Sequence, residues 1–272
     1  MNTKVKFLLP QTLLALLSLA GPVPAAPSPT DAEKILRYQK ALEQDPRDAQ
    51  VYYQWGNTLD EEGMTTDAMD KYQKAVESDP RMAAAYYAWG NDLSRLGGYR
   101  EACGKFEKAV QLNPRFSKAY YDWSLALLSL GDYGEAVQKC REGLRINPRD
   151  PQVYTNWGVI LGQEGKRAQA VQKFEKAVEL DGRFTAAYFD WGLTLMDWGR
   201  PEAALHQFKR VAEIDPGDGG AYYEWGLALE QLGDAAGATE KFKQVLALPS
   251  GDAGTRGAAQ AEMYKIQKRL PK

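Results

Sequence analysis

Residues 86–114 read YYAWGNDLSRLGGYREACGKFEKAVQLNP, and the 272-residue chain repeats this pattern along most of its length. A Trp recurs every 34 residues, at Trp55, Trp89, Trp123, Trp157, Trp191 and Trp225. A fixed period of this length is typical of one supersecondary unit copied in tandem. The period therefore predicts a repeat architecture, in which each copy packs against its neighbours.

Several other positions keep their residue type from copy to copy. Gly follows the Trp in five copies, and Ser124 replaces it in the third. An Ala recurs thirteen residues after the Trp and an aromatic residue seventeen after it, except that the third copy has Cys140. Another Gly stands eight residues after every Trp, at Gly63, Gly97, Gly131, Gly165, Gly199 and Gly233. These columns give the repeat a defined internal pattern.

The columns predict a pair of helices in each copy. Trp55 and Leu59 lie on one helical face, and Gly63 ends that helix because Gly adopts the left-handed cap conformation without steric cost. Ala68 and Tyr72 then mark a face of a second helix, which Pro80 ends. We expect the Trp column to fill the core of each hairpin, and the small Gly and Ala residues to let the two helices approach closely.

The pattern resembles the tetratricopeptide repeat family, whose 34-residue unit joins a large aromatic, a Leu-Gly pair, a Tyr and a spaced Ala, aromatic and Pro. A Tyr–Trp-Gly variant stands here where that family has an aromatic residue before Leu-Gly. The resemblance covers residues 49–252 as six full copies. It implies an all-α, right-handed α-solenoid of about fourteen helices, whose first helices line a concave groove that binds partners as extended peptides or helices.

The ends of the array differ from its repeats. A lone second helix, capped by Thr30 or Asp31, precedes the first full copy, and the helix at 254–269 has lost the Trp-Gly pair. Such polar terminal units keep a solenoid soluble. The predicted segments are a signal peptide at 1–25, a Pro-rich linker at 26–30, a half-repeat helix at 31–48, six repeats at 49–82, 83–116, 117–150, 151–184, 185–218 and 219–252, and a capping helix at 253–272.

The first residues indicate an exported bacterial protein. Lys4 and Lys6 precede an apolar stretch at 7–20, and small residues at 23–25 or 18–20 offer a cleavage site. We expect the periplasm as its compartment. An uncleaved segment that anchors the chain to the inner membrane is the alternative.

The chemistry of an enzyme is missing from the sequence. His206 is the only His and is expected to be exposed, and no Cys/His spacing fits a metal. Cys103 and Cys140 are expected to be buried free thiols, with a disulfide as the alternative. We expect no catalytic residues, no metal and no cofactor. The formal net charge is −2, and the sequence shows no cluster of basic residues. Nucleic acid is therefore not expected as a partner.

The residues expected to face the groove come from the first helices. They stand one or two residues before the Trp, or two and six after it: Tyr53, Asn57, Tyr87, Asn91, Arg95, Tyr121, Asp122, Asn156, Phe189, Asp190, Tyr223 and Glu224. Tyr supplies contact area at low entropic cost, and amide and acid groups supply direction. The excess of Asp and Glu favours a neutral or basic partner segment.

Two structural roles stay open at this point. The Tyr and Phe residues two before the Trp either contact a ligand or pack between successive first helices. Trp198, the seventh Trp, either widens an apolar spot near Met196 or covers a seam between repeats.

The leading functional hypothesis is a non-enzymatic exported scaffold that binds a protein or peptide in the groove. The alternatives are a glycan-handling accessory protein in polysaccharide secretion, by analogy with exported members of the family, and a self-assembling structural array. Participation in a membrane-associated complex and self-association are compatible with the first reading.

Overall fold

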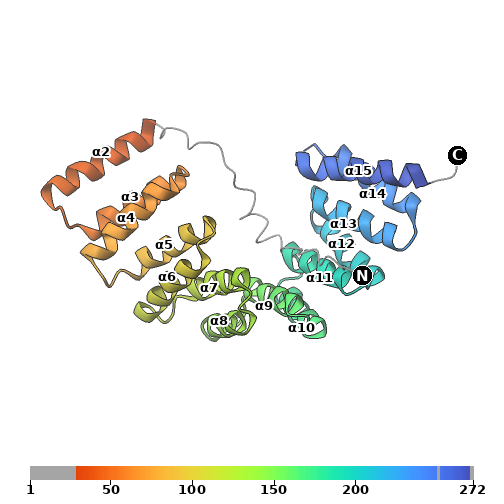
Figure 1. Ribbon diagram of the computed structural model, residues 1–272, viewed down its shortest axis with the longest axis horizontal. Coiled ribbons are helices and arrows are strands. Elements are labelled where there is room, and N and C mark those ends of the chain that lie inside the picture. The colour runs from red at the N-terminus through yellow and green to blue at the C-terminus, as the bar shows by residue number, and fades with distance from the viewer. Residues whose placement is uncertain (1–28, 250–251, 270–272) are drawn as a thin grey trace. The chain divides into compact units, whose positions relative to one another are not determined.

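The computed structural model describes residues 29–249 and 252–269, and within them it contains fourteen α-helices and no strand (Figure 1). This is the all-α helical-repeat fold class that the sequence predicts. The predicted signal peptide lies outside the described residues. The chain divides into two compact units, one ending at Pro148 and the other beginning at Arg149.

The first unit contains a lone helix followed by three hairpins. Its helices are α2 (Pro29–Gln44), α3 (Ala49–Glu61), α4 (Thr65–Ser78), α5 (Ala83–Arg95), α6 (Tyr99–Leu112), α7 (Ser117–Leu130) and α8 (Tyr133–Ile146). Because α2 begins at Pro29, Thr30 and Asp31 lie inside its first turn, so the predicted cap is wrong. Pro suits this position, since its fixed φ is helical and the first N–H groups lack intrahelical partners anyway.

The second unit contains three hairpins followed by one longer helix. Its helices are α9 (Pro151–Gln163), α10 (Arg167–Leu180), α11 (Thr185–Asp197), α12 (Pro201–Ile214), α13 (Gly219–Gln231), α14 (Ala235–Ala247) and α15 (Ala253–Arg269). Ile266 and Met263 of α15 belong to the apolar cluster around α14, while Lys265 and Lys268 are exposed. The last helix therefore covers a hydrophobic face with a polar outer surface.

Each hairpin turns at the Gly that stands eight residues after its Trp. All six of these residues have φ between 73° and 85°, and they are the only positive-φ residues among the described positions. A side chain at such a φ costs conformational energy, whereas Gly adopts it freely. The predicted role of this column is confirmed.

The interior of a hairpin is the contact between the Gly of its first helix and the aromatic ring of its second. The Ala column and the aromatic column are buried, with Phe106, Phe174 and Phe208 at 0% exposure. A Cβ placed on Gly90 would lie 2.7 Å from the ring of Phe106. Gly is thus required because the ring occupies the space that any side chain would need.

The third hairpin solves the same packing problem with different residues. It has Ser124 in place of Gly and Cys140 in place of the aromatic ring, and both are fully buried. The larger residue on the first helix is matched by a smaller one on the second, so the interior stays closed.

The Trp column lies at the edge of the hairpin interior. Only Trp123 is buried, at 8% exposure, and the other five are partly buried. Four of those five pack against core clusters: Trp55, Trp89, Trp191 and Trp225. The prediction that the column forms the core is therefore met in part. The repeat period shows that a position is constrained, but it does not show which way the side chain faces.

The remaining expectations for single residues are met in part. Cys103 and Cys140 form no disulfide, as expected, but only Cys140 is buried and Cys103 is half-buried. His206 is exposed, as predicted. None of the described helices combines the length and the apolar character needed to cross a membrane.

Candidate functional site

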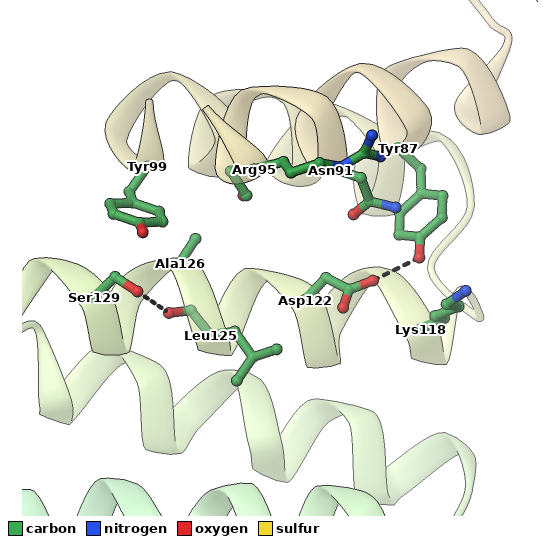
Figure 2. A pocket seen from close by; sticks show the side chains of 10 residues that line it. Tyr87, Asn91, Arg95, Tyr99, Lys118, Asp122, Leu125, Ala126 and Ser129 are labelled. Atoms are coloured by element: carbon green, nitrogen blue, oxygen red, sulfur yellow. Dashed lines mark hydrogen bonds between the residues drawn. The ribbon is translucent and has the colours of Figure 1, made fainter. Parts of the chain in front are cut away.

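A cavity of the first unit lies between two first helices, α5 and α7. Its volume is about 260 Å³. It is lined by Tyr87, Asn91, Ser94, Arg95 and Tyr99 of the second hairpin, and by Lys118, Asp122, Leu125, Ala126 and Ser129 of the third. In Figure 2 the side chains of Tyr87 and Asn91 extend from one helix toward the other, which carries Lys118, Asp122 and Leu125, while Arg95 runs along its own helix. We call this the α5–α7 cavity.

Helix geometry explains why these residues meet. Tyr87, Asn91 and Arg95 are four residues apart, so they form a single row along one face of α5. Lys118, Asp122 and Leu125 are four and three residues apart, so they form the facing row on α7. Four of the predicted groove residues, Tyr87, Asn91, Arg95 and Asp122, thus come together in one cavity.

A short hydrogen bond joins the two rows at one end of the cavity. The phenol of Tyr87 donates to Oδ2 of Asp122 at 2.5 Å, as the dashed line in Figure 2 shows. Burial raises the pKa of Asp122 to about 6, although the Tyr87 bond and the charge of Lys118 act in the opposite direction. Burial is also the main cause of the raised pKa of Tyr87. This end of the cavity therefore holds a carboxylate that is poorly solvated and able to bind a further donor.

Tyr87 has a packing role as well as a place in the cavity. Its ring centroid lies 4.6 Å from that of Phe116 and 6.1 Å from that of Phe106. Aromatic pairs at such distances stabilise the hairpin beyond their buried area. The two roles left open for this column, ligand contact and packing, are therefore compatible at Tyr87.

At the other end of the cavity Arg95 is held by two carboxylates. Its guanidinium donates to Asp60 at 2.5 Å and to Asp92 at 3.0 Å. These bonds hold the guanidinium of Arg95 against α3 and α5. Fewer of its N–H groups can therefore bind a partner than the sequence suggests.

Asp92, which holds Arg95, was not singled out by the sequence analysis. It is 1% exposed, and burial followed by the charge of Asp60 raises its pKa to about 7. Its Oδ2 is buried without a hydrogen-bond partner. The corresponding position in the other copies holds Thr58, Ala126, Ile160, Thr194 or Ala228, so an Asp in this column was the signal that could have identified it.

The first hairpin shows a related arrangement of its predicted groove residues. Asn57 accepts a hydrogen bond from the phenol of Tyr72 at 2.9 Å, and the ring of Tyr53 lies 6.0 Å from that of Tyr72. Both Asn57 and Tyr53 are partly exposed. The amide oxygen of Asn57 therefore already accepts a hydrogen bond within its own hairpin.

Four other predicted groove residues are almost entirely buried. Exposure is 8% at Tyr121, 4% at Asn156, 5% at Phe189 and 2% at Asp190. Phe189 packs edge to face on Phe208, with ring centroids 5.8 Å apart. At Phe189 the packing role dominates, and we leave all four residues out of the candidate site.

Tyr223 and Glu224 lie on α13 in an acidic environment. Burial raises the pKa of Glu224 to about 7. Burial and then the charges of Glu262, Glu224 and Glu230 raise the pKa of Tyr223. Both residues stay partly exposed, so a donor or cation could reach them.

The described residues offer no arrangement typical of a metal centre. They contain no group of three or more His, Cys, Asp or Glu side chains placed to hold an ion. The fold and the cavity thus define a helical-repeat protein that presents side chains from successive hairpins at one surface.

Comparison with known proteins identifies the family. A family profile described as "Tetratricopeptide repeat" matches residues 87–151, 155–218 and 189–253, and a second profile with the same description matches residues 38–70. The chain belongs to the tetratricopeptide repeat family, as the resemblance of its repeats implied. No curated protein matches its sequence significantly.

Solved structures of similar fold cover most of the chain. YrrB, described as a TPR protein with an unusual peptide-binding site, is 27% identical, with a TM-score of 0.55 over 68% of this chain and 95% of its own. A tetratricopeptide repeat protein from Parabacteroides merdae is 14% identical, with a TM-score of 0.67 over 88% and 96%. PilF of Pseudomonas aeruginosa is 22% identical, with a TM-score of 0.61 over 80% and 100%. The last two likenesses concern the fold alone.

Proposed function

We propose that this protein is a non-enzymatic scaffold that binds a polypeptide segment of a partner protein at the α5–α7 cavity. The observation that carries the proposal is the convergence of Tyr87, Asn91 and Asp122 from two successive first helices on one open cavity. Proteins of this repeat family act as interaction scaffolds, and the similar structure of YrrB is described as having a peptide-binding site.

The chemistry of the cavity favours a neutral or basic segment. Asp122 is poorly solvated, and Arg95, the cation on the α5 wall of the cavity, is already paired with Asp60 and Asp92. A backbone amide, a Lys or an Arg of the partner would donate to Asp122, while Leu125 and the ring of Tyr87 would contact its apolar part. Lys118 at the rim would disfavour a strongly basic segment at that end.

A selection from a displayed peptide library tests the proposal. Peptides that bind the wild type are expected to lose at least about tenfold in affinity with Asn91→Ala/Leu125→Asp, because this pair removes one polar and one apolar contact of the cavity. Gln111→Ala on the exposed face of α6 is the matched control and should bind as the wild type does. Equal binding by the cavity variant, with its helical content intact, would remove the cavity from the proposal.

Export is a separate part of the proposal and rests on the sequence of residues 1–25. Mass spectrometry of the full chain expressed in a Gram-negative bacterium should find a mature form in the periplasm, cleaved after Ala25 or Ala20. A chain that keeps Met1 and sediments with the inner membrane would favour the anchored alternative, and one that stays in the cytoplasm would refute export.

A further inference from the structure

Lysine residues cover the exposed faces of the Trp column in most hairpins. The Lys sixteen residues after the Trp places its Nζ over the indole, at 3.4 to 4.5 Å from the ring centroid. The pairs are Lys71 with Trp55, Lys105 with Trp89, Lys139 with Trp123, Lys173 with Trp157 and Lys241 with Trp225. A cation over an indole face is attracted by the ring quadrupole. Each of these hairpins thus supplies a cation to its own Trp.

The fifth hairpin lacks this lysine. The corresponding position on α12 is Gln207, which carries no charge. A cavity of about 320 Å³ lies beside it, and its walls include Val171, Trp191, Leu195 and Trp198. The face of Trp191 therefore lines an open cleft at the place where the other hairpins hold an ammonium group.

A second indole makes this cleft different from the flank of any other hairpin. Trp198 occupies a column that holds Glu or Leu in the other copies. It packs against the apolar cluster around Phe208 and lines the same cavity as Trp191. The guanidinium of Arg200 stacks on Trp198 at 3.6 Å and so is already engaged.

We propose that the cleft between Trp191 and Trp198 receives a lysine side chain from a partner polypeptide. The ammonium group takes the position over Trp191 that each of the other hairpins fills with its own Lys. The methylene chain lies along Leu195 and Val171, and the amide oxygen of Gln207 accepts a hydrogen bond from the ammonium. The inference rests on the proposed binding of a polypeptide partner and assigns a second contact point and its chemistry.

Two cations lie close together in the fourth hairpin, which has Lys166 at the position of Arg200. There Lys173 lies over Trp157 at 3.9 Å, and Lys166 pairs with Glu164 at 2.6 Å. The fifth hairpin has Trp198 in place of Glu164, and the guanidinium of Arg200 stacks on that indole instead. A carboxylate ligand would have to displace Arg200 from Trp198, whereas a lysine leaves that stack intact.

The test follows the indole N–H resonances of the full chain by NMR during peptide titrations. The probes are acetyl-Gly-Lys-Gly-amide and its norleucine and glutamate counterparts, with methyl glucoside as the sugar control. Trp191→Phe and Trp198→Phe assign the two signals. The lysine probe should shift both, with an affinity at least about threefold higher than that of norleucine, which lacks the cation.

Two exchange variants sharpen the test. Gln207→Lys restores the internal lysine and should abolish the lysine-dependent shifts. Lys241→Gln, its mirror change in the sixth hairpin, should make the Trp225 resonance sensitive to the lysine probe. Equal affinity for lysine and norleucine, tighter binding of glutamate or methyl glucoside, or shifts that survive Gln207→Lys would each overturn the inference.

The outcome is separable from that of the α5–α7 cavity. Asn91→Ala/Leu125→Asp should leave the response of Trp191 to the lysine probe unchanged, because these residues belong to the other unit. If library peptides ignore the cavity variant while the lysine response persists, the proposed cavity fails and the cleft stands. If the response is absent while library peptides depend on Asn91 and Leu125, the cleft fails alone.

Discussion

The third and fifth hairpins both depart from the repeat pattern, but they depart in opposite ways. In the third, Ser124 and Cys140 change together, and both stay fully buried. In the fifth, the interior keeps Gly192 against Phe208, while the flank has Gln207 where the other hairpins have Lys. The first departure is compensated inside the hairpin, and the second leaves a cleft beside Trp191.

This difference distinguishes two kinds of departure from the repeat pattern. A change that is matched by its contact partner preserves packing and says little about function, since interiors tolerate substitutions that conserve volume. A surface change that no neighbouring residue matches leaves a side chain without its usual contact partner. Another molecule can then bind there and make that contact. The four predictions below concern these two hairpins, with one comparison variant in the second hairpin, and go from the largest expected effect to the smallest.

Removing the buried ring of the fifth hairpin should have the largest effect. Phe208→Ala is expected to lower the free energy of unfolding by about 3–5 kcal/mol, because it leaves a cavity against Gly192. Urea denaturation followed by circular dichroism measures the loss. His206→Ala, two residues away and exposed, should change it by less than about 0.5 kcal/mol. If both variants cost the same, Phe208 is not the interior residue that its burial indicates.

Restoring the usual ring to the third hairpin tests the compensation. Cys140→Phe should cost about 1–3 kcal/mol through overpacking against Ser124. Adding Ser124→Gly should recover at least half of that loss, since rings in the other hairpins lie where a Cβ on this residue would be. Additive losses in the double variant would show that the two positions are independent.

The third hairpin also carries Asp122, whose raised pKa predicts a pH dependence. With the pKa at about 6 in the folded protein and 3.8 as its ordinary value, the folded state takes up the proton first as the pH falls. The contribution of Asp122 to the free energy of unfolding should therefore rise between pH 7 and pH 4, by about 2 kcal/mol. Asp122→Asn keeps an oxygen for Tyr87 and should remove this dependence. The measurement is the wild-type-minus-variant stability at pH 7.5 and 4.5, and an unchanged difference would contradict the raised pKa.

The smallest effect is expected on the flank. Gln207→Lys should raise the free energy of unfolding by about 0.5–1 kcal/mol by adding a cation over Trp191. Lys105→Gln should lower it by a similar amount, since Nζ of Lys105 lies 3.4 Å from the Trp89 ring centroid. Thermal melts of both variants at low salt measure the change. Destabilisation by Gln207→Lys would mean that the cleft cannot hold an ammonium group.

The parts of the fold that sequence predicts well are those fixed by local backbone geometry. Gly63 and its counterparts adopt positive φ because the chain turns there, and the fully buried Ala column lies where helical spacing places it. Trp55 is less buried than the sequence predicts: one part of its ring packs against the core, and Lys71 of the next helix lies over its face. The Lys recurs sixteen residues after the Trp in five copies, but a charged residue in a helix usually indicates a solvated face, so its column does not by itself predict contact with the indole.

The sequence predicted which positions of the repeat face the groove, but not which copies expose them. Tyr87, Asn91 and Asp122 were identified because their spacing puts them on one face of each first helix. Asp92 and Gln207 were missed because each matters through its difference from the same position in other copies. Asn156 and Asp190 were included although they are buried, because their column is open in one hairpin and closed in another.

The turn glycines have a consequence for the stereochemistry that the chain accepts. A Cβ on Gly97 or Gly233 would have no atom within 4 Å, so only the φ of about 80° excludes an L side chain. That φ lies in the left-handed helical region, which a D-residue prefers because it mirrors the right-handed region of an L-residue. Both glycines are exposed, so semisynthetic protein with D-alanine at these turns should be more stable than the L-alanine variant, which has the same side chain at a disfavoured φ.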